Sequence, residues 1–200
     1  SELEKELGFD GKVVIGYIGS FVNYEGLDLL LEACSILKEK HGDIFRLLLV
    51  GDGDTMQLLR RTARFLQLED QIVFTGRVSH DEVQKYYSLI DIAPLPRKGL
   101  RVCELVSPLK PFEAMGSGKV LVTSSVQALA EIVQDGVTGL VFEKDNSQDL
   151  AEKLEIALLD ENLRGEIGAN ANKWVKENHS WEVISERVTK IYDEILEGKQ

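Results

Sequence analysis

The chain has 200 residues, 44% of them hydrophobic and only four of them proline, so it can bury a substantial core as one large or two small domains. Its 34 acidic and 23 basic residues give a net charge of −11, which argues against a nucleic-acid or anionic-membrane surface of any size. No apolar run approaches the roughly 18 residues of a membrane-spanning helix, and no signal peptide opens the chain. We therefore expect a cytoplasmic location; peripheral membrane attachment through a segment outside these residues stays open.

Short apolar runs alternate along the chain with segments whose apolar residues recur at helical spacing. Residues 1–11 are charged and contain two glycines, which indicates a linker that enters the domain. The predicted strands are residues 12–19, 45–50, 71–75, 90–94, an apolar run that ends at 124, and 139–142. The predicted helices are residues 27–41, 55–66, 82–89, one from about 108, 128–134, 149–159, 162–177 and 181–196. Residues 12–200 are therefore expected to form an α/β domain, a parallel β-sheet with helices on both faces and right-handed crossovers.

Four of the predicted strands end in glycine-containing or polar segments. In a parallel sheet, ligands bind at the carboxyl ends of the strands. The four segments are Gly19-Ser20, Gly51-Asp52-Gly53, Gly76-Arg77-Val78 and the long loop of residues 94–107. Because they are expected at the same edge, a single ligand could touch several of them.

The helix predicted from about residue 108 begins in a segment suited to an anion. Ser107 is a plausible N-cap, and Pro108 a plausible first helical residue because proline lacks the N–H that the first turn leaves unpaired. Lys110 adds a positive charge to this turn, and Glu113 follows one turn later. A phosphorylated ligand with hydroxyl groups would suit these residues. The simpler alternative is an ordinary capped helix on which Lys110 and Glu113 pair at the surface.

The remaining polar clusters predict no metal site or nucleophile. Residues 51–54, Gly-Asp-Gly-Asp, lack the third glycine of a dinucleotide fingerprint, because Met56 stands there. An aspartate-capped turn explains them more simply than hard oxygen ligands for a divalent ion. The three histidines are scattered without a zinc or triad pattern. Cys34 lies in an apolar helical pattern and is expected to be a reduced core residue, whereas the state of Cys103 stays open.

Several motifs in the second half of the chain carry a family resemblance. Residues 113–115 read Glu-Ala-Met, a small-residue turn and an apolar strand follow within 116–124, residues 131–133 read Glu-Ile-Val, and 135–141 read Asp-Gly-Val-Thr-Gly-Leu-Val. This succession resembles the donor-binding half of retaining, nucleotide-sugar-dependent glycosyltransferases of family 4, which have the GT-B fold. The resemblance extends over residues 12–196.

That resemblance implies a Rossmann-like domain, the C-terminal half of a two-domain enzyme whose N-terminal acceptor domain lies outside these residues. The donor would be a nucleotide-diphosphate sugar, with no cofactor and no required metal. The parent enzyme would transfer a sugar to an unidentified acceptor, and the isolated half would bind nucleotide weakly without turnover.

The resemblance also implies roles for particular residues. Glu113 matches a glutamate that binds the ribose hydroxyls, and Glu104 is an approximate counterpart of one that faces the transferred sugar. Eight residues separate them here instead of the seven usual in the family. The catalytic candidates are Glu104 and Lys110. The donor-binding candidates are Gly19, Ser20, Arg77, Val78, Ser107, Pro108, Leu109, Lys110 and Glu113.

One departure from the family pattern concerns charge near the first strand. The family commonly has an arginine and a lysine where this chain has Ser20 and Glu25. Either Lys110, together with Arg97, Lys98 or Arg101 of the long loop, supplies the charge that a diphosphate needs, or tight donor binding is lost. The alternatives to a transferase are therefore a non-catalytic nucleotide- or sugar-binding module and half of a nucleotide-sugar epimerase.

Overall fold

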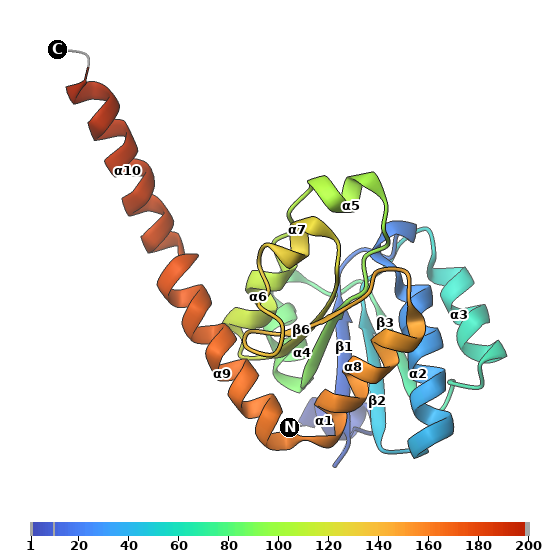
Figure 1. Ribbon diagram of the computed structural model, residues 1–200. Coiled ribbons are helices and arrows are strands. Elements are labelled where there is room, and N and C mark those ends of the chain that lie inside the picture. The colour runs from blue at the N-terminus through green and yellow to red at the C-terminus, as the bar shows by residue number, and fades with distance from the viewer. Residues whose placement is uncertain (1, 10, 199–200) are drawn as a thin grey trace.

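Six parallel strands form one sheet in the order β3-β2-β1-β4-β5-β6 (Figure 1). The computed structural model describes residues 2–9 and 11–198. The strands are β1 (Val13–Ile18), β2 (Phe45–Val50), β3 (Ile72–Gly76), β4 (Ile92–Leu95), β5 (Val120–Ser124) and β6 (Leu140–Phe142). The predicted parallel sheet is confirmed. The strand order reverses between β1 and β4, and ligands of such sheets bind at this point, beyond the carboxyl ends of the strands.

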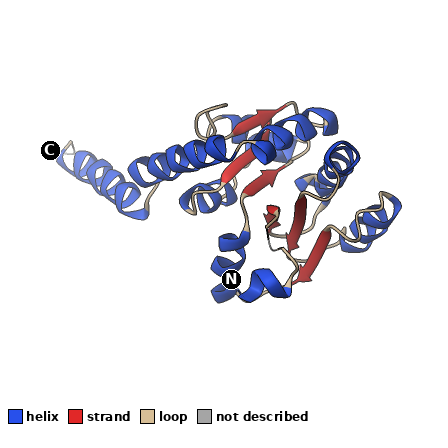
Figure 2. Ribbon diagram, turned by 90° about the horizontal axis from the view of Figure 1, so that it is seen from below, coloured by secondary structure: helices blue, strands red, loops and turns tan. Residues whose placement is uncertain are grey.

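Helices cover both faces of the sheet, as predicted (Figure 2). They are α1 (Glu2–Glu6), α2 (Leu27–His41), α3 (Met56–Phe65), α4 (Val83–Leu89), α5 (Arg101–Leu105), α6 (Lys110–Gly116), α7 (Gln127–Ala130), α8 (Ser147–Leu159), α9 (Glu161–Asn178) and α10 (Trp181–Glu197), with the 3-10 turns η1 (Asn23–Glu25) and η2 (His80–Glu82). Helices α2 and α8 pack side by side over one face (Figure 1). Helix α4 contacts β1, and α6 and α9 pack together and contact β5.

The centre of the sheet is packed closely enough to require a glycine in β1. A Cβ on Gly16 would lie 2.2 Å from the Cγ1 atom of Ile90, which follows α4. Ile15 beside it and Ile92 in the adjacent strand are fully buried. The apolar strand residues predicted from the sequence therefore form the core, and Cys34 of α2 lies within it, as expected.

The described part of the N-terminal lead packs onto the domain. Phe9 is fully buried, and Leu3 and Leu7 contact the core from α1 and the turn after it. Residues 2–9 are thus a structured edge of the domain and not a free linker, because burial of these apolar side chains holds the segment in place.

Helix α6 begins at Lys110 and not at Pro108, so the predicted start is wrong. Leu109 is the N-cap, and neither Ser107 nor Pro108 contributes a cap. The amides of Phe112 and Glu113 both donate to the carbonyl of Leu109. Pro111 takes the first-turn place expected for Pro108, and its missing N–H costs nothing there.

The long loop after β4 contains a helix that the sequence analysis did not predict. Helix α5 is five residues long, and its Cys103 is buried. The amides of Cys103 and Glu104 donate to the carbonyl of Leu100, and the thiol lies 3.5 Å from the carbonyl oxygen of Tyr24. Burial of this small side chain helps to hold a segment that has no apolar periodicity of its own.

The C-terminal helix α10 projects away from the sheet (Figure 1). Trp181 is 77% exposed, and Ile191, Tyr192 and Leu196 are more than half exposed. None of the helices among the described residues combines the length and the apolar character that crossing a membrane requires.

Candidate functional site

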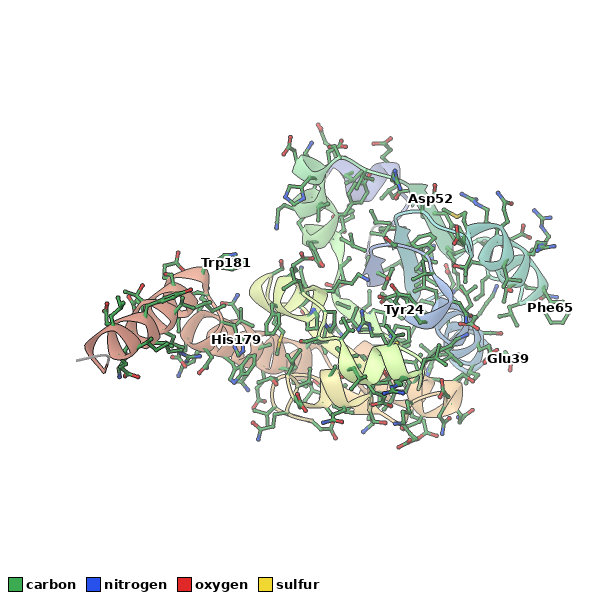
Figure 3. All side chains as sticks on the ribbon, turned by 90° about the horizontal axis from the view of Figure 1, so that it is seen from above. Tyr24, Glu39, Asp52, Phe65, His179 and Trp181 are labelled. Atoms are coloured by element: carbon green, nitrogen blue, oxygen red, sulfur yellow. The ribbon has the colours of Figure 1, made fainter. Side chains whose placement is uncertain are left out.

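The exits of the first three strands join in one loop cluster at the carboxyl edge of the sheet. The Gly19 amide donates to the Val50 carbonyl over 2.9 Å, and the Gly51 amide donates to the Gly76 carbonyl over 3.0 Å. A Cβ on Gly51 would lie 1.9 Å from the Gly19 carbonyl oxygen, so this approach requires glycine. Figure 3 looks onto this side of the molecule, with Asp52 and Tyr24 labelled. The predicted convergence of these segments is confirmed.

A buried group of charges lies at the point where the strand order reverses. Glu25, at the end of η1, is 2% exposed. Its Oε1 atom lies 3.1 Å from a guanidinium nitrogen of Arg97, in the loop after β4, and 3.0 Å from Nζ of Lys110. The other guanidinium nitrogen of Arg97 donates to the Val106 carbonyl over 2.9 Å. We call Glu25, Arg97, Lys110 and Tyr17 the Glu25 cluster.

Tyr17 completes this cluster from β1. Its hydroxyl accepts a hydrogen bond from Lys110 Nζ over 2.9 Å and donates one to the Ser20 carbonyl over 3.1 Å. Burial raises the pKa of the Tyr17 phenol well above its usual value, and the neighbouring Glu25 carboxylate raises it further. The phenol therefore stays protonated and continues to donate to Ser20.

The ammonium of Lys110 lies against the backbone at the exit of β1. A Cβ on Gly19 would meet Cε of Lys110 at 2.5 Å. The Lys110 side chain is 22% exposed, which leaves it accessible from the edge of the sheet. A cation therefore stands at the strand exit although Ser20 and Glu25 themselves provide none.

The basic residues of the loop after β4 do not all point to this place. Lys98 pairs with Asp28 over 2.6 Å and donates to Asn23. Arg101 is exposed at the start of α5. Among the four cations considered from the sequence, Arg97 and Lys110 are the two that reach position 25.

Glu113 lies one turn after Lys110 on α6 and is exposed. Its Oε2 atom accepts a hydrogen bond from the Tyr87 hydroxyl over 3.2 Å. Within the described residues its other oxygen makes no hydrogen bond. The suggested surface pair between Lys110 and Glu113 does not form, because Lys110 turns to Glu25 instead.

Glu104 is engaged elsewhere. One carboxylate oxygen accepts the Gln127 amide over 2.7 Å, and the other lies 2.6 Å from Nζ of Lys144. These two contacts lower the pKa of Glu104 below its usual value. Both oxygens are thus used to hold α5 against the start of α7 and the loop after β6, and the structure does not bring Glu104 to Lys110.

The other sequence-predicted residues are placed as follows. Arg77 is exposed and Val78 is half-buried, directly after the left-handed Gly76 that ends β3. Ser107 is exposed and Pro108 is buried in the segment between α5 and α6. Leu109 is 67% exposed and, with Phe112, Glu113 and Trp181, lines a hollow of about 310 Å³ between α6 and the start of α10.

The sequence analysis missed two features of this edge. It noted the unusual Glu25 but could not identify Arg97 as its partner, because 72 residues separate them. It also treated His179 as an isolated residue, whereas its ring stacks on Phe112 and Trp174 with centroids 4.8 and 4.5 Å away. The described residues contain no group of acidic, histidine or cysteine side chains that could hold a metal ion.

Comparisons with known proteins agree with this architecture. The family described as "Glycosyl transferases group 1" matches residues 1–174. The capsular polysaccharide biosynthesis glycosyltransferase CapM of Staphylococcus aureus is 29% identical over 191 residues, which cover 93% of this chain and 48% of the relative. The chain spans about half the length of the curated relatives that it matches.

Two solved structures show the same fold. Anabaena HepE in complex with UDP-glucose matches with a TM-score of 0.85 and 21% identity, over 97% of this chain and 52% of that one. The C-terminal domain of the group 1 glycosyl transferase LpcC from Francisella tularensis matches with a TM-score of 0.77 and 22% identity, over 90% of this chain and 92% of that one.

Proposed function

Because the chain belongs to the glycosyl transferases group 1 family, we propose that it is the donor-binding half of a glycosyltransferase. The donor is a nucleotide-diphosphate sugar, and the acceptor binds to the remainder of the parent chain. The observation that carries this proposal is the position of Lys110: its ammonium lies against Gly19 at the strand-order reversal, with Glu113 one turn further along α6.

The chemistry of transfer explains why these groups suit a donor. When the bond between the sugar and the diphosphate breaks, negative charge grows on the leaving phosphate. A preorganised cation stabilises that charge most effectively in a site shielded from water. Lys110 supplies the cation, while the carboxylate of Glu113 can accept hydrogen bonds from both hydroxyls of a ribose. The backbone directly after Gly76, at the exposed Arg77 and the half-buried Val78, would meet the nucleotide base.

The proposed reaction needs no resident cofactor or metal, because protein cations meet the donor's charge. By the family resemblance the configuration at the transferred carbon is retained. Glu104 then serves to hold α5 in place, since both of its oxygens are already engaged.

The proposed partner of this half is the acceptor domain of the same parent chain. Two facts support it: the chain spans about half of its relatives, and α10 carries exposed apolar side chains. Val188, Ile191 and Ile195 recur at helical spacing and share one face of α10. We expect this face to pack against the acceptor half. We also propose a cytoplasmic location; the excess of acidic over basic residues, which disfavours an anionic membrane surface, is compatible with it.

The non-catalytic alternative rested on the missing cations at positions 20 and 25. Arg97 and Lys110 lie beside Glu25 and bring positive charge to this strand exit. The lack of cations at positions 20 and 25 is therefore no argument that the donor site has been lost. No contact described above favours half of an epimerase.

Calorimetry tests the proposal directly. The 200-residue chain should bind at least one of UDP, GDP and ADP, and Lys110→Met should weaken that binding by about tenfold or more, as expected for a charge-assisted contact. The isolated chain should show no sugar transfer, and the full-length parent should show it with the matching nucleotide sugar. If none of the three nucleotides binds to the chain or to the parent, the proposal is wrong.

A further inference from the structure

Glu25 introduces a negative charge where a diphosphate would need positive charge, yet it is one of the most deeply buried charged groups of the described chain. Both Arg97 and Lys110 approach the same oxygen, Oε1, at 3.1 and 3.0 Å. Oε2 is buried and makes no hydrogen bond within the described residues. A buried carboxylate is tolerated only when cations and hydrogen bonds compensate for its lost hydration. The three groups therefore form one electrostatic unit.

The two cations of this unit are not equivalent. Arg97 is 8% exposed at its side chain and is also fixed to the Val106 carbonyl, so it has little access to a ligand. Lys110 is more exposed, and its ammonium contacts only Glu25 and Tyr17 within the described residues. An ammonium carries three N–H donors, so at least one of them remains for a ligand oxygen beside the hydrogen bond to Tyr17 and the ion pair to Glu25.

We propose that Glu25 and Tyr17 are positioning residues, which fix the ammonium of Lys110 at the exit of β1 so that its remaining N–H faces the donor's diphosphate. The assignment rests on the proposed function. A lysine side chain is long and flexible, and the ion pair to Glu25 together with the hydrogen bond to Tyr17 restricts where its ammonium lies. Arg97 offsets the charge of Glu25, so the ion pair that orients Lys110 leaves a net positive charge at the strand exit.

This role predicts an effect opposite in sign to simple electrostatics. If Glu25 only repelled the diphosphate, Glu25→Gln would tighten nucleotide binding. If Glu25 positions Lys110, Glu25→Gln should weaken binding by about fivefold or more, because residues in one network couple strongly. The loss should depend on Lys110: in the Lys110→Met background, Glu25→Gln should cause no further loss.

The experiment is a double-mutant cycle on the 200-residue chain, read by calorimetry with UDP, GDP and ADP and with the corresponding nucleosides. We expect Glu25→Gln to weaken binding of the nucleoside diphosphate and to leave binding of the nucleoside unchanged. A general folding defect would instead weaken the binding of both. Lys40→Met and Glu155→Gln are the matched controls. Each breaks the 2.7 Å ion pair between Lys40, near the C-terminal end of α2, and Glu155 of α8. Glu25 precedes the other end of α2, so these substitutions should leave nucleotide binding unchanged.

Glu25→Gln leaves Arg97 without its counter-ion, so thermal unfolding accompanies each titration. Tyr17→Phe repeats the cycle from the other anchor: it removes the 2.9 Å contact to Lys110 and keeps the ring in the core. It should weaken diphosphate binding only when Lys110 is present. The positioning role is wrong if Glu25→Gln binds the diphosphate more tightly. It is also wrong if Glu25→Gln and Tyr17→Phe each lose as much affinity in the Lys110→Met background as in the unsubstituted chain. Either result leaves the proposed function intact. A parent chain that binds no nucleoside diphosphate overturns the proposed function as well.

Discussion

The hydroxyl of Tyr87 donates a hydrogen bond of 3.2 Å to Oε2 of Glu113 and so ties α4 to α6. Burial raises the pKa of this phenol above its usual value, and the Glu113 carboxylate raises it further, so the donor persists at neutral pH. One oxygen of Glu113 is thereby fixed, while the other has no partner in the described part of the chain. This hydrogen bond restrains the Glu113 carboxylate while leaving its second oxygen available.

We therefore expect Glu113→Ala to weaken nucleoside diphosphate binding by about tenfold or more, since hydrogen bonds to a charged group contribute about 1.5–3 kcal/mol. Tyr87→Phe should weaken it less, by about two- to fivefold, because it frees the carboxylate without removing it. Calorimetry measures both. Glu152→Ala, on the exposed surface of α8, is the control and should have no effect. If Glu113→Ala binds the nucleotide as tightly as the unsubstituted chain does, Glu113 has no role in nucleotide binding.

The buried pair of Glu25 and Arg97 predicts a large effect on stability. Both side chains are less than one-tenth exposed, and removal of Arg97 leaves the buried Glu25 carboxylate with Lys110 as its one remaining cation among the described residues. Arg97→Met should lower the free energy of unfolding by about 3–5 kcal/mol. The double variant with Glu25→Gln should be less destabilised than Arg97→Met alone, because the buried carboxylate that has lost Arg97 is replaced by a neutral amide.

Urea unfolding provides the measurement, and the pair of Lys98 and Asp28 provides the control. That pair is closer, at 2.6 Å, but Asp28 is 41% exposed. Lys98→Met should therefore cost less than about 1 kcal/mol. Similar losses for Arg97→Met and Lys98→Met would show that burial does not decide the contribution of these ion pairs.

Glu104 predicts a dependence of stability on pH. The Gln127 amide and the Lys144 ammonium lower its pKa in the folded state. The unfolded chain therefore binds the proton at a higher pH, near the ordinary glutamate value of about 4.3. The stabilisation by Glu104 is present above that value and is lost as the pH falls through the lower, folded-state pKa.

Denaturant unfolding between about pH 3 and 7 should show a smaller loss of stability on acidification in Glu104→Gln than in the parent. Glu143→Gln is the comparison variant, because Glu143 lies next to Lys144 but its side chain does not bond to α7. Its free energy of unfolding should depend on pH as that of the unsubstituted chain does. An unchanged slope in Glu104→Gln would mean that its contacts to Gln127 and Lys144 do not stabilise the folded chain.

Two glycines should respond to alanine in opposite directions. Gly16→Ala forces a methyl group against Ile90 and should destabilise the chain by about 1–3 kcal/mol. Gly165 lies exposed within α9, where nothing is within 4 Å of an added Cβ. Gly165→Ala should stabilise by about 0.5–1 kcal/mol, because glycine is a poor helix former. Thermal and urea unfolding check both, and equal effects would contradict the packing seen at Gly16.

Local signals were sufficient for most elements of the fold. Helix α2 spans the predicted residues because its apolar periodicity lies between Gly26 and Gly42. Helix α8 ends at the predicted residue 159 and begins two residues before the predicted 149, where Asn146 caps it by accepting the Asp149 amide. Because strands alternate with helices along the chain, a parallel sheet is the expected arrangement. Information of this kind acts over a few residues, and the sequence displays it directly.

The start of α6 shows where such signals become ambiguous. Pro108 and Pro111 both suit a first helical turn, and only the packed structure places Pro111 there. Helix α5 is held by the burial of Cys103 against Tyr24 and by the contacts of Glu104 to Gln127 and Lys144, none of which a local apolar pattern predicts.

By itself, the sequence determined the parallel sheet, most of its helices and the edge at which a ligand would bind, since these follow from short-range patterns of apolar residues and glycines. Only the tertiary structure decided which charges meet at that edge. Glu25, Arg97 and Lys110 come from three distant segments, and a buried charge selects its partners by proximity and desolvation and not by spacing along the chain.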